Sequence, residues 1–131
     1  MKLIYSLLLL TFLSGCATID SVKPGAGPYF NIQGTSYSKV WTVANSVMSR
    51  QFNIVSTNRG EGIIKAEKAA GMTSWGEVVG VFITPAKEGA AEYKIEAVSL
   101  KRSTLQITGQ NWETTILEGM KAELSMHASS N

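Results

Sequence analysis

The spacing of apolar residues changes twice along this chain, and these two changes limit the folds that it can adopt. From Tyr37 to Phe52, apolar side chains recur at the three- and four-residue intervals of an amphipathic helix. Shorter segments of alternating or β-branched residues follow, and the helical spacing returns after Asn111. The predicted order of elements is therefore helix, strands, helix.

Four segments have the composition of strands and are separated by residues that favour turns: 52–56, 63–68, 77–84 and 93–100. A fifth, short strand is expected at residues 104–108. The short connections favour antiparallel hairpins over parallel crossovers. We therefore predict an α+β fold, in which an antiparallel sheet of four to five strands is covered on one face by an N-terminal and a C-terminal helix. The other face is expected to meet water through the polar positions Lys65, Glu67, Lys94 and Glu96.

The helix starts have recognisable caps. Ser36, or else Thr35, precedes the first helix and can accept a hydrogen bond from a free backbone amide. Asn111 is placed to cap a second helix over residues 112–125, and Glu113 then lies at the positive helix end.

The first sixteen residues indicate export. Lys2 supplies a positive charge, and an uncharged apolar stretch follows to Leu13, which is too short to span a bilayer as a helix. A buried core helix is the alternative, but a core helix would not be expected at the extreme N-terminus before a cysteine. The sequence Leu13-Ser14-Gly15-Cys16 resembles the lipobox of bacterial lipoprotein signal peptides. This resemblance implies that signal peptidase recognises Leu13, Ser14 and Gly15, cuts before Cys16 and leaves lipid, including palmitate-like acyl chains, on that cysteine.

Cys16 is the only cysteine of the chain, so no disulfide partner exists for it within the chain. Lipid attachment would account for a single cysteine in an oxidising compartment. Ala17 follows it, and among enteric lipoproteins a residue other than Asp at this position implies release to the outer membrane. The expected location is the inner leaflet of the outer membrane, facing the periplasm.

These observations predict four regions: a signal peptide at 1–15, the lipidated cysteine with a flexible tether at 16–33, the α+β domain at 34–126, and a frayed tail at 127–131. The Pro and Gly residues of the tether disfavour regular structure. Fully extended, it would reach on the order of 50 Å and lift the domain off the lipid. Within it, residues 29–32 are more apolar and can form a short edge strand.

Residues suited to catalysis are few. The only histidine, His127, is expected in the tail, and the only aspartate, Asp20, in the tether. Glu61, Glu67, Glu77 and Glu96 could in principle supply an acid/base pair, although their positions in turns and on polar strand phases favour solvated side chains. We expect no catalytic residue, no metal and no cofactor.

The charge distribution does not suggest nucleic-acid binding. Without Lys2 the chain has eleven basic and ten acidic residues, and the basic residues form no cluster. Residues 71–76 instead suggest a protein contact, because Met72 and Trp75 lie there among glycines. The alternative is that Trp75 only covers an edge or end of the core. Either this loop or an exposed sheet edge, such as residues 94–98, is the expected contact surface.

Three short motifs resemble those of small, uncharacterised bacterial envelope lipoproteins: Tyr-x-x-Val-Trp at 37–41, Gly-Ile-Ile at 62–64 and Thr-Gly-Gln-Asn-Trp-Glu at 108–113. The element order is also loosely similar to that of small domains in the C-subunit lipoprotein of the outer-membrane barrel-assembly machine. Neither resemblance implies active residues. The expected function is a non-catalytic, lipid-anchored domain that binds or scaffolds another envelope protein. The alternative is a carrier of a small ligand or lipid.

Overall fold

Alternating and helical segments form one sheet and two helices. The computed structural model describes residues 18–25, 27–68, 76–101 and 111–128, with side chains described as far as Met126. In chain order the elements are η2 (Ile19–Ser21), β1 (Tyr29–Gln33), α2 (Tyr37–Gln51), β2 (Asn53–Asn58), β3 (Ile63–Lys68), β4 (Glu77–Thr84), β5 (Glu92–Lys101) and α3 (Trp112–Ala128).

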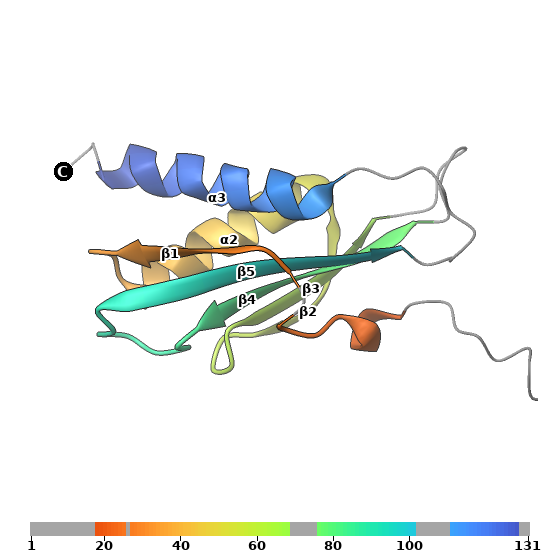
Figure 1. Cartoon of the computed structure of the whole chain (residues 1–131), viewed down its shortest axis with the longest axis horizontal. Coiled ribbons are helices and arrows are strands. Elements are labelled where there is room, and N and C mark those ends of the chain that lie inside the picture. Colours follow the sequence, from red (N-terminus) through yellow and green to blue (C-terminus); the bar gives the residue numbers. More distant parts are fainter. Residues whose placement is uncertain (1–17, 26, 69–75, 102–110, 129–131) are drawn as a thin grey trace, which may run out of the picture.

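The five strands form an antiparallel sheet in the order β1-β5-β4-β3-β2. Both helices lie on the same face of this sheet (Figure 1). The predicted α+β fold is thereby confirmed. β2, β3, β4 and β5 each pair with the next strand along the chain, whereas β1 pairs with β5 from a distant part of the chain.

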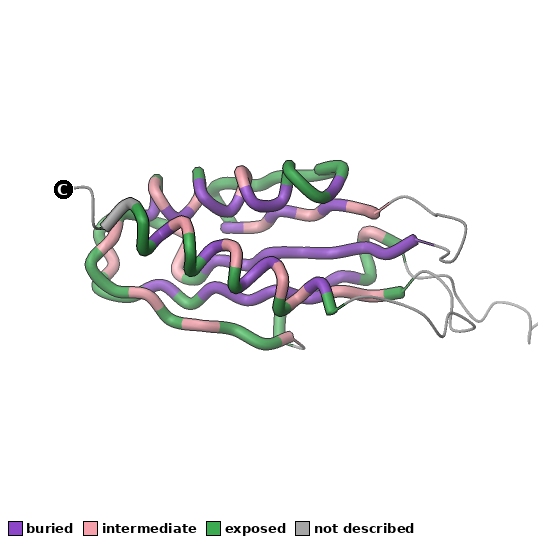
Figure 2. Tube along the Cα trace, turned by 90° about the horizontal axis from the view of Figure 1, so that it is seen from above, coloured by how far each residue is buried: buried purple, intermediate pink, exposed green. Residues whose placement is uncertain are grey.

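The main core lies between the helices and the sheet. Apolar stripes of α2 and α3 meet the side chains of alternate strand positions. Figure 2 shows how buried and exposed residues alternate along the two helices. The Phe52 and Trp112 rings meet edge to face, with centroids 5.1 Å apart, where α2 ends and α3 begins. The largest fully buried side chains of this core are Tyr93, Met48, Ile64, Ile83, Ile95, Ile116 and Met120.

Both predicted helix caps are confirmed. The Ser36 hydroxyl oxygen accepts a hydrogen bond from the Lys39 amide at 3.1 Å, and the Asn111 carbonyl Oδ1 accepts one from the Thr114 amide at 3.2 Å. α3 continues to Ala128, so the expected fraying from residue 127 is wrong for its first two residues. The reason is that the apolar stripe through Met120 and Leu124 holds the last turns on the sheet.

The sheet has the expected number of strands, but one of its five described strands is β1 and not the segment expected at residues 104–108. Residues 104–108 lie outside the described residues. The fifth strand of the sheet is β1, which falls within residues 16–33 and matches the short apolar segment noted there.

The expected flexible tether is wrong for most of its length. Residues 18–28, of which Ala26 is not described, run across the sheet face opposite the helices and are here called the strap (Figure 1). Val22 of the strap has no exposed surface and packs with Val78, Phe82 and Val98. Glu96, expected in water, is only 3% exposed because the strap covers it. The domain therefore begins at the strap and not at residue 34.

Candidate functional site

β1 is the outermost strand on one side of the sheet, and one of its two edges has no partner strand among the described residues. The Ala97 amide donates to the Pro28 carbonyl at 3.1 Å, so the next hydrogen-bonded pairs of this antiparallel ladder are Phe30 with Ile95 and Ile32 with Tyr93. The amides and carbonyls of Tyr29, Asn31 and Gln33 consequently point away from β5. They form a short, regular row of backbone donors and acceptors.

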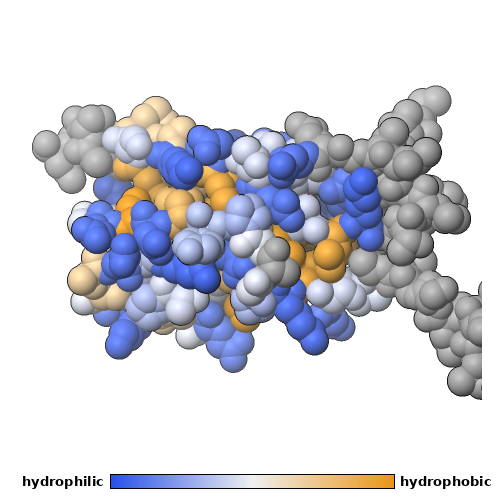
Figure 3. Space-filling view, in the orientation of Figure 1, coloured by the Kyte–Doolittle hydropathy of each residue, from blue (hydrophilic) through white to orange (hydrophobic). Residues whose placement is uncertain are grey.

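An apolar groove lies along this free edge. It has a volume of about 360 Å³ and is called the β1–α3 groove; its lining residues are Phe30, Asn31, Ile32, Lys121, Leu124 and Ser125. Phe30 and Ile32 are half-buried and point to the helix side of the sheet, because their pairing partners Ile95 and Tyr93 belong to the main core. Figure 3 shows apolar surface between α3 and β1, surrounded by hydrophilic side chains.

One cation borders the groove. Lys121 Nζ lies 5.3 Å from the centroid of the Phe30 ring and 3.2 Å from Glu118 Oε1. Both partners of this ion pair are largely exposed, so the pair contributes little to stability. The Lys121 ammonium group is therefore a hydrogen-bond donor beside the apolar surface of the groove.

The opposite edge of the sheet is less suited to pairing. β2 contains a bulge, since Ile54 pairs with Ala66 and Ser56 with Lys65, which leaves Val55 without a partner residue. A bulge bends the strand and interrupts the row of backbone groups, which is a common way to protect an exposed edge. β1 has no such register shift and no charged side chain.

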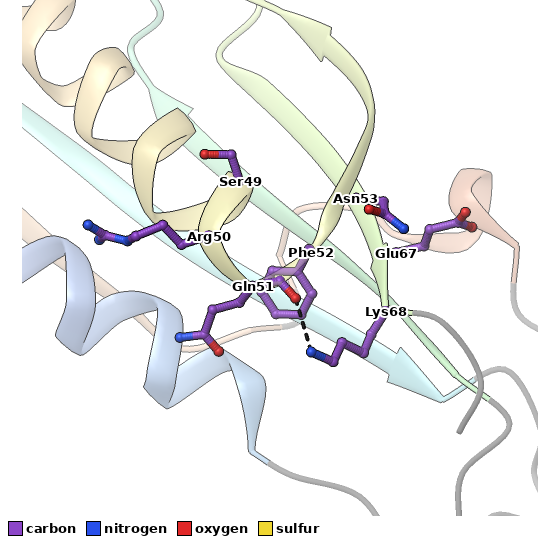
Figure 4. A pocket seen from close by; sticks show the side chains of 7 residues that line it. All are labelled: Ser49, Arg50, Gln51, Phe52, Asn53, Glu67 and Lys68. Carbon is purple, nitrogen blue, oxygen red and sulfur yellow. Dashed lines mark hydrogen bonds between the residues drawn. The ribbon is translucent and has the colours of Figure 1, made fainter. Parts of the chain in front are cut away.

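A second hollow, of about 300 Å³, lies where α2 ends, and its lining residues are Ser49, Arg50, Gln51, Phe52, Asn53, Glu67 and Lys68 (Figure 4). Lys68 Nζ donates to the Gln51 carbonyl at 3.1 Å and lies 5.2 Å from the Trp112 ring centroid. Arg50 forms an ion pair with Glu123 of α3. Both cations are thus engaged within the chain, at a helix end whose dipole repels anions. This arrangement stabilises the end of α2 and does not form an anion site.

The structure does not bring the candidate glutamates together. Glu77 lies on the helix side of the sheet, whereas Glu96, opposite Phe82, lies on the strap side. Along β4 these positions are separated by five residues, or roughly 16 Å, which exceeds the spacing of paired catalytic carboxylates. Glu61 is exposed in the β2–β3 turn, and Glu67 pairs with Val78 on the strap side.

Glu77 and Glu96 are the two buried carboxylates of the described residues. Burial raises the pKa of Glu77, while Lys101 and a hydrogen bond with Trp112 lower it and Glu113 raises it further. Glu96 accepts three hydrogen bonds from backbone amides of the strap. Both carboxylates therefore form hydrogen bonds with groups inside the domain.

Other sequence candidates are dispersed or lie outside the described residues. Asp20 is exposed in η2, and His127 lies in the last turn of α3. Leu13, Ser14, Gly15, Cys16, Met72 and Trp75 all lie outside the described residues. Residues 94–98, expected at a sheet edge, belong to β5 and are flanked by β1 and β4, so that expectation is wrong.

Sequence reasoning missed the groove and the contacts of Glu96. The signal for the groove was present as Phe30 and Ile32 at alternating positions, but the surrounding Pro and Gly residues indicated a tether. No pattern in the sequence pairs Gly25 with Glu96. Among the described residues, no group of three His, Cys, Asp or Glu side chains could hold a metal ion, and no helix is long and apolar enough to cross a membrane.

No protein-family model matches the chain, and a search of curated proteins also finds no match.

Proposed function

We propose that this chain is a lipid-anchored envelope lipoprotein whose domain faces the periplasm and binds an extended segment of another envelope protein. One observation carries the binding role: the free edge of β1 borders an apolar groove. The anchor at Cys16 and the location at the outer membrane rest on the lipobox resemblance and on Ala17. A binding role without catalysis is supported by the wide separation of Glu77 and Glu96.

The proposed mode is addition of a strand. The backbone of the partner segment pairs with the outward amides and carbonyls of Tyr29, Asn31 and Gln33, which supplies affinity without regard to sequence. Alternate side chains of that segment then enter the β1–α3 groove, where Phe30, Ile32 and Leu124 favour apolar groups. Such a partner segment has apolar residues at every second position.

The test is photo-crosslinking in living cells with a photoreactive amino acid at three positions. Probes at Asn31 and Ser125 lie on the free edge and in the groove, and a probe at Thr57 lies on the bulged edge as the matched control. We expect one shared partner at Asn31 and Ser125 and none at Thr57. Absence of a crosslinked protein at both groove positions would overturn the proposal.

A proline at position 31 sharpens this experiment. The Asn31 amide points away from β5, so Asn31→Pro removes a donor to the partner without breaking a β1–β5 hydrogen bond. We expect the crosslink from Ser125 to disappear in this variant while the circular dichroism of the purified domain stays unchanged. A crosslink that persists with Asn31→Pro would contradict strand addition. A further probe at Trp75 tests the predicted contact at Met72 and Trp75.

A carrier of a small apolar ligand or lipid is the second candidate, because the volume of the β1–α3 groove lies in the range of small-molecule sites. Native mass spectrometry of residues 17–131, exported behind a cleavable signal peptide without a lipobox and purified from the periplasm, distinguishes this role. A co-purified ligand that is lost with Leu124→Asp would support it, and the mass of the protein alone would exclude it.

A further inference from the structure

The strap is held by a shape match on the sheet. Val22 enters a notch above Gly80 of β4, where a Cβ would lie only 2.6 Å from Val22 Cγ1 and 3.1 Å from the Phe82 ring. Any larger residue at position 80 would displace the valine. Ile19 packs beside it against the same small cluster. The contact therefore fixes where the N-terminal segment crosses the sheet.

Glu96 holds the strap at a second point. Both of its carboxylate oxygens accept from the Gly25 amide, at 2.9 and 2.8 Å, and Oε2 also accepts from the Gly27 amide at 3.0 Å. Gly27 approaches β5 so closely that a Cβ would lie 1.9 Å from the Ala97 carbonyl oxygen. Charge-assisted hydrogen bonds of this kind are stronger than neutral ones. The strap is thus a docked part of the domain that leads directly into β1.

This docking leaves little free chain before the cysteine. Cys16 is separated from Thr18, the first described residue, by two peptide units, so their Cα atoms are at most about 8 Å apart. If the strap were free, residues 17–28 would instead provide roughly 40 Å of extended chain. The docked strap therefore determines how far the domain can move from the point where the chain is lipidated.

The strap also determines which part of the domain is nearest that point. η2 lies at the end of the sheet where β3 and β5 terminate and β4 begins, here called the anchored end (Figure 1). The register places Lys68, Glu77 and Lys101 side by side at this end. The turn between β4 and β5, which contains Lys87, lies at the opposite end.

We infer that the docked strap holds the anchored end of the domain against the lipid surface, so that the β1–α3 groove lies on the part of the domain that is distant from the membrane. This inference rests on the lipid anchor of the proposed function. α3 starts at the anchored end, and its groove residues Lys121 to Ser125 lie nine to thirteen residues further on, or about 14–20 Å along the helix. A partner then approaches from the periplasm and does not compete with the lipid for the groove.

The test uses the full lipidated chain in liposomes of phosphatidylethanolamine and phosphatidylglycerol that contain a nickel-chelating lipid. Because lipidation blocks Cys16, a single introduced cysteine can carry a nitroxide label, either as Lys101→Cys at the anchored end or as Lys87→Cys at the opposite end; both lysines are exposed. We expect several-fold stronger relaxation of the label by nickel at position 101 than at position 87. Equal relaxation at the two positions would overturn the inference.

Two variants release the strap by different means. Gly27→Ala adds a Cβ where no space exists, and Glu96→Gln removes the charge that holds two amides. We expect the difference between the two labels to disappear in either variant. Matched controls are Gly60→Ala, in a turn where a Cβ has ordinary space, and Glu92→Gln, at an exposed position of the same strand. A difference that survives in both strap variants would contradict the role of the strap.

Mass spectrometry of Cys16 separates the possible failures. An unmodified Cys16 would overturn the anchor and this inference together. A lipidated Cys16 with equal relaxation at both labels would overturn the orientation alone and leave the crosslinking result unaffected. Circular dichroism and the protection of β4 amides from exchange show whether each variant remains folded; if Gly27→Ala does not fold, Glu96→Gln provides the decision.

Discussion

At the scale of single residues, two buried glutamates on neighbouring strands are accommodated in different ways. The carboxylate of Glu96 accepts hydrogen bonds from backbone amides of the strap, whereas Glu77 lies beside Trp112 and Lys101. The alternation of polar and apolar residues in β5 predicted that the side chain of Glu96 is exposed to solvent. This assignment was wrong because the cover of that face comes from a segment whose Pro and Gly content shows no periodicity.

The raised pKa of Glu77 predicts a pH dependence of stability. Burial makes the folded carboxyl bind its proton more tightly than the unfolded one, whose pKa is about 4.5, so the free energy of unfolding falls as pH rises from 4.5 through the folded pKa. Glu77→Gln retains an acceptor for Trp112 but carries no charge. We expect this variant to be more stable than the wild type at neutral pH and to lose this pH dependence. Urea unfolding from acid to neutral pH measures both, with Glu92→Gln as the control. Parallel pH profiles of wild type and Glu77→Gln would contradict the expectation.

At the scale of elements, the two sheet edges and the helix starts were predicted to different extents. The bounds of β3 and β4 coincide with the expected 63–68 and 77–84, because alternation and β-branched content report directly on burial. The bulge in β2 and the groove beside β1 were not predictable, since both depend on register between segments far apart in the chain. A second cap of α2 was not predictable either, because it is the side chain of Glu88, which lies in the distant β4–β5 turn.

That second cap is Glu88, in the β4–β5 turn. Its carboxylate accepts from the backbone amides of Tyr37 and Ser38, at 3.0 and 2.7 Å, and contacts the Ser38 hydroxyl. The hydrogen bond with that hydroxyl is the main cause that lowers the pKa of Glu88, so this stabilisation is present above about pH 4.5 and is lost as pH falls through the folded pKa. We expect Glu88→Gln to reduce stability at neutral pH, with no difference from the wild type in strong acid. The sign is opposite to that of Glu77, and the same urea series checks it. A deficit that remains in strong acid would exclude the charge as its cause.

At the scale of the whole molecule, local patterns were sufficient for the class of fold and for the edge strand at residues 29–32, but not for the strap. Helix-strand-helix order and antiparallel pairing followed from local patterns. The inclusion of residues 18–28 in the domain did not, because Val22 and Glu96 acquire their roles only when distant segments meet. The groove of the proposed site likewise forms only where β1 meets α3, which explains why the partner contact was predicted at Met72 and Trp75 or at residues 94–98.

Hydrogen exchange tests this architecture as a whole. We expect the amides of β3, β4 and β5 to exchange last, because these three strands are paired on both sides. In β1 the amides of Phe30 and Ile32 are bonded to β5, whereas those of Asn31 and Gln33 face outward. The amides of Asn31 and Gln33 should exchange at least about tenfold faster than those of Phe30 and Ile32, which corresponds to a difference of about 1.4 kcal/mol in the free energy of opening. Uniform protection along β1 would contradict the assigned register.

The separation of the strap from its holding residue has a consequence for biogenesis. Glu96 lies 71 positions after Gly25, and the strand that pairs with β1 is the last of the sheet to be synthesised. In the lipoprotein that we propose, the chain crosses a membrane from its N-terminus, so the residues that follow Cys16 arrive before β5 exists for them to dock on. Enzymes that process Cys16 would then meet an extended, accessible substrate, and the later folding of β5 would dock the strap.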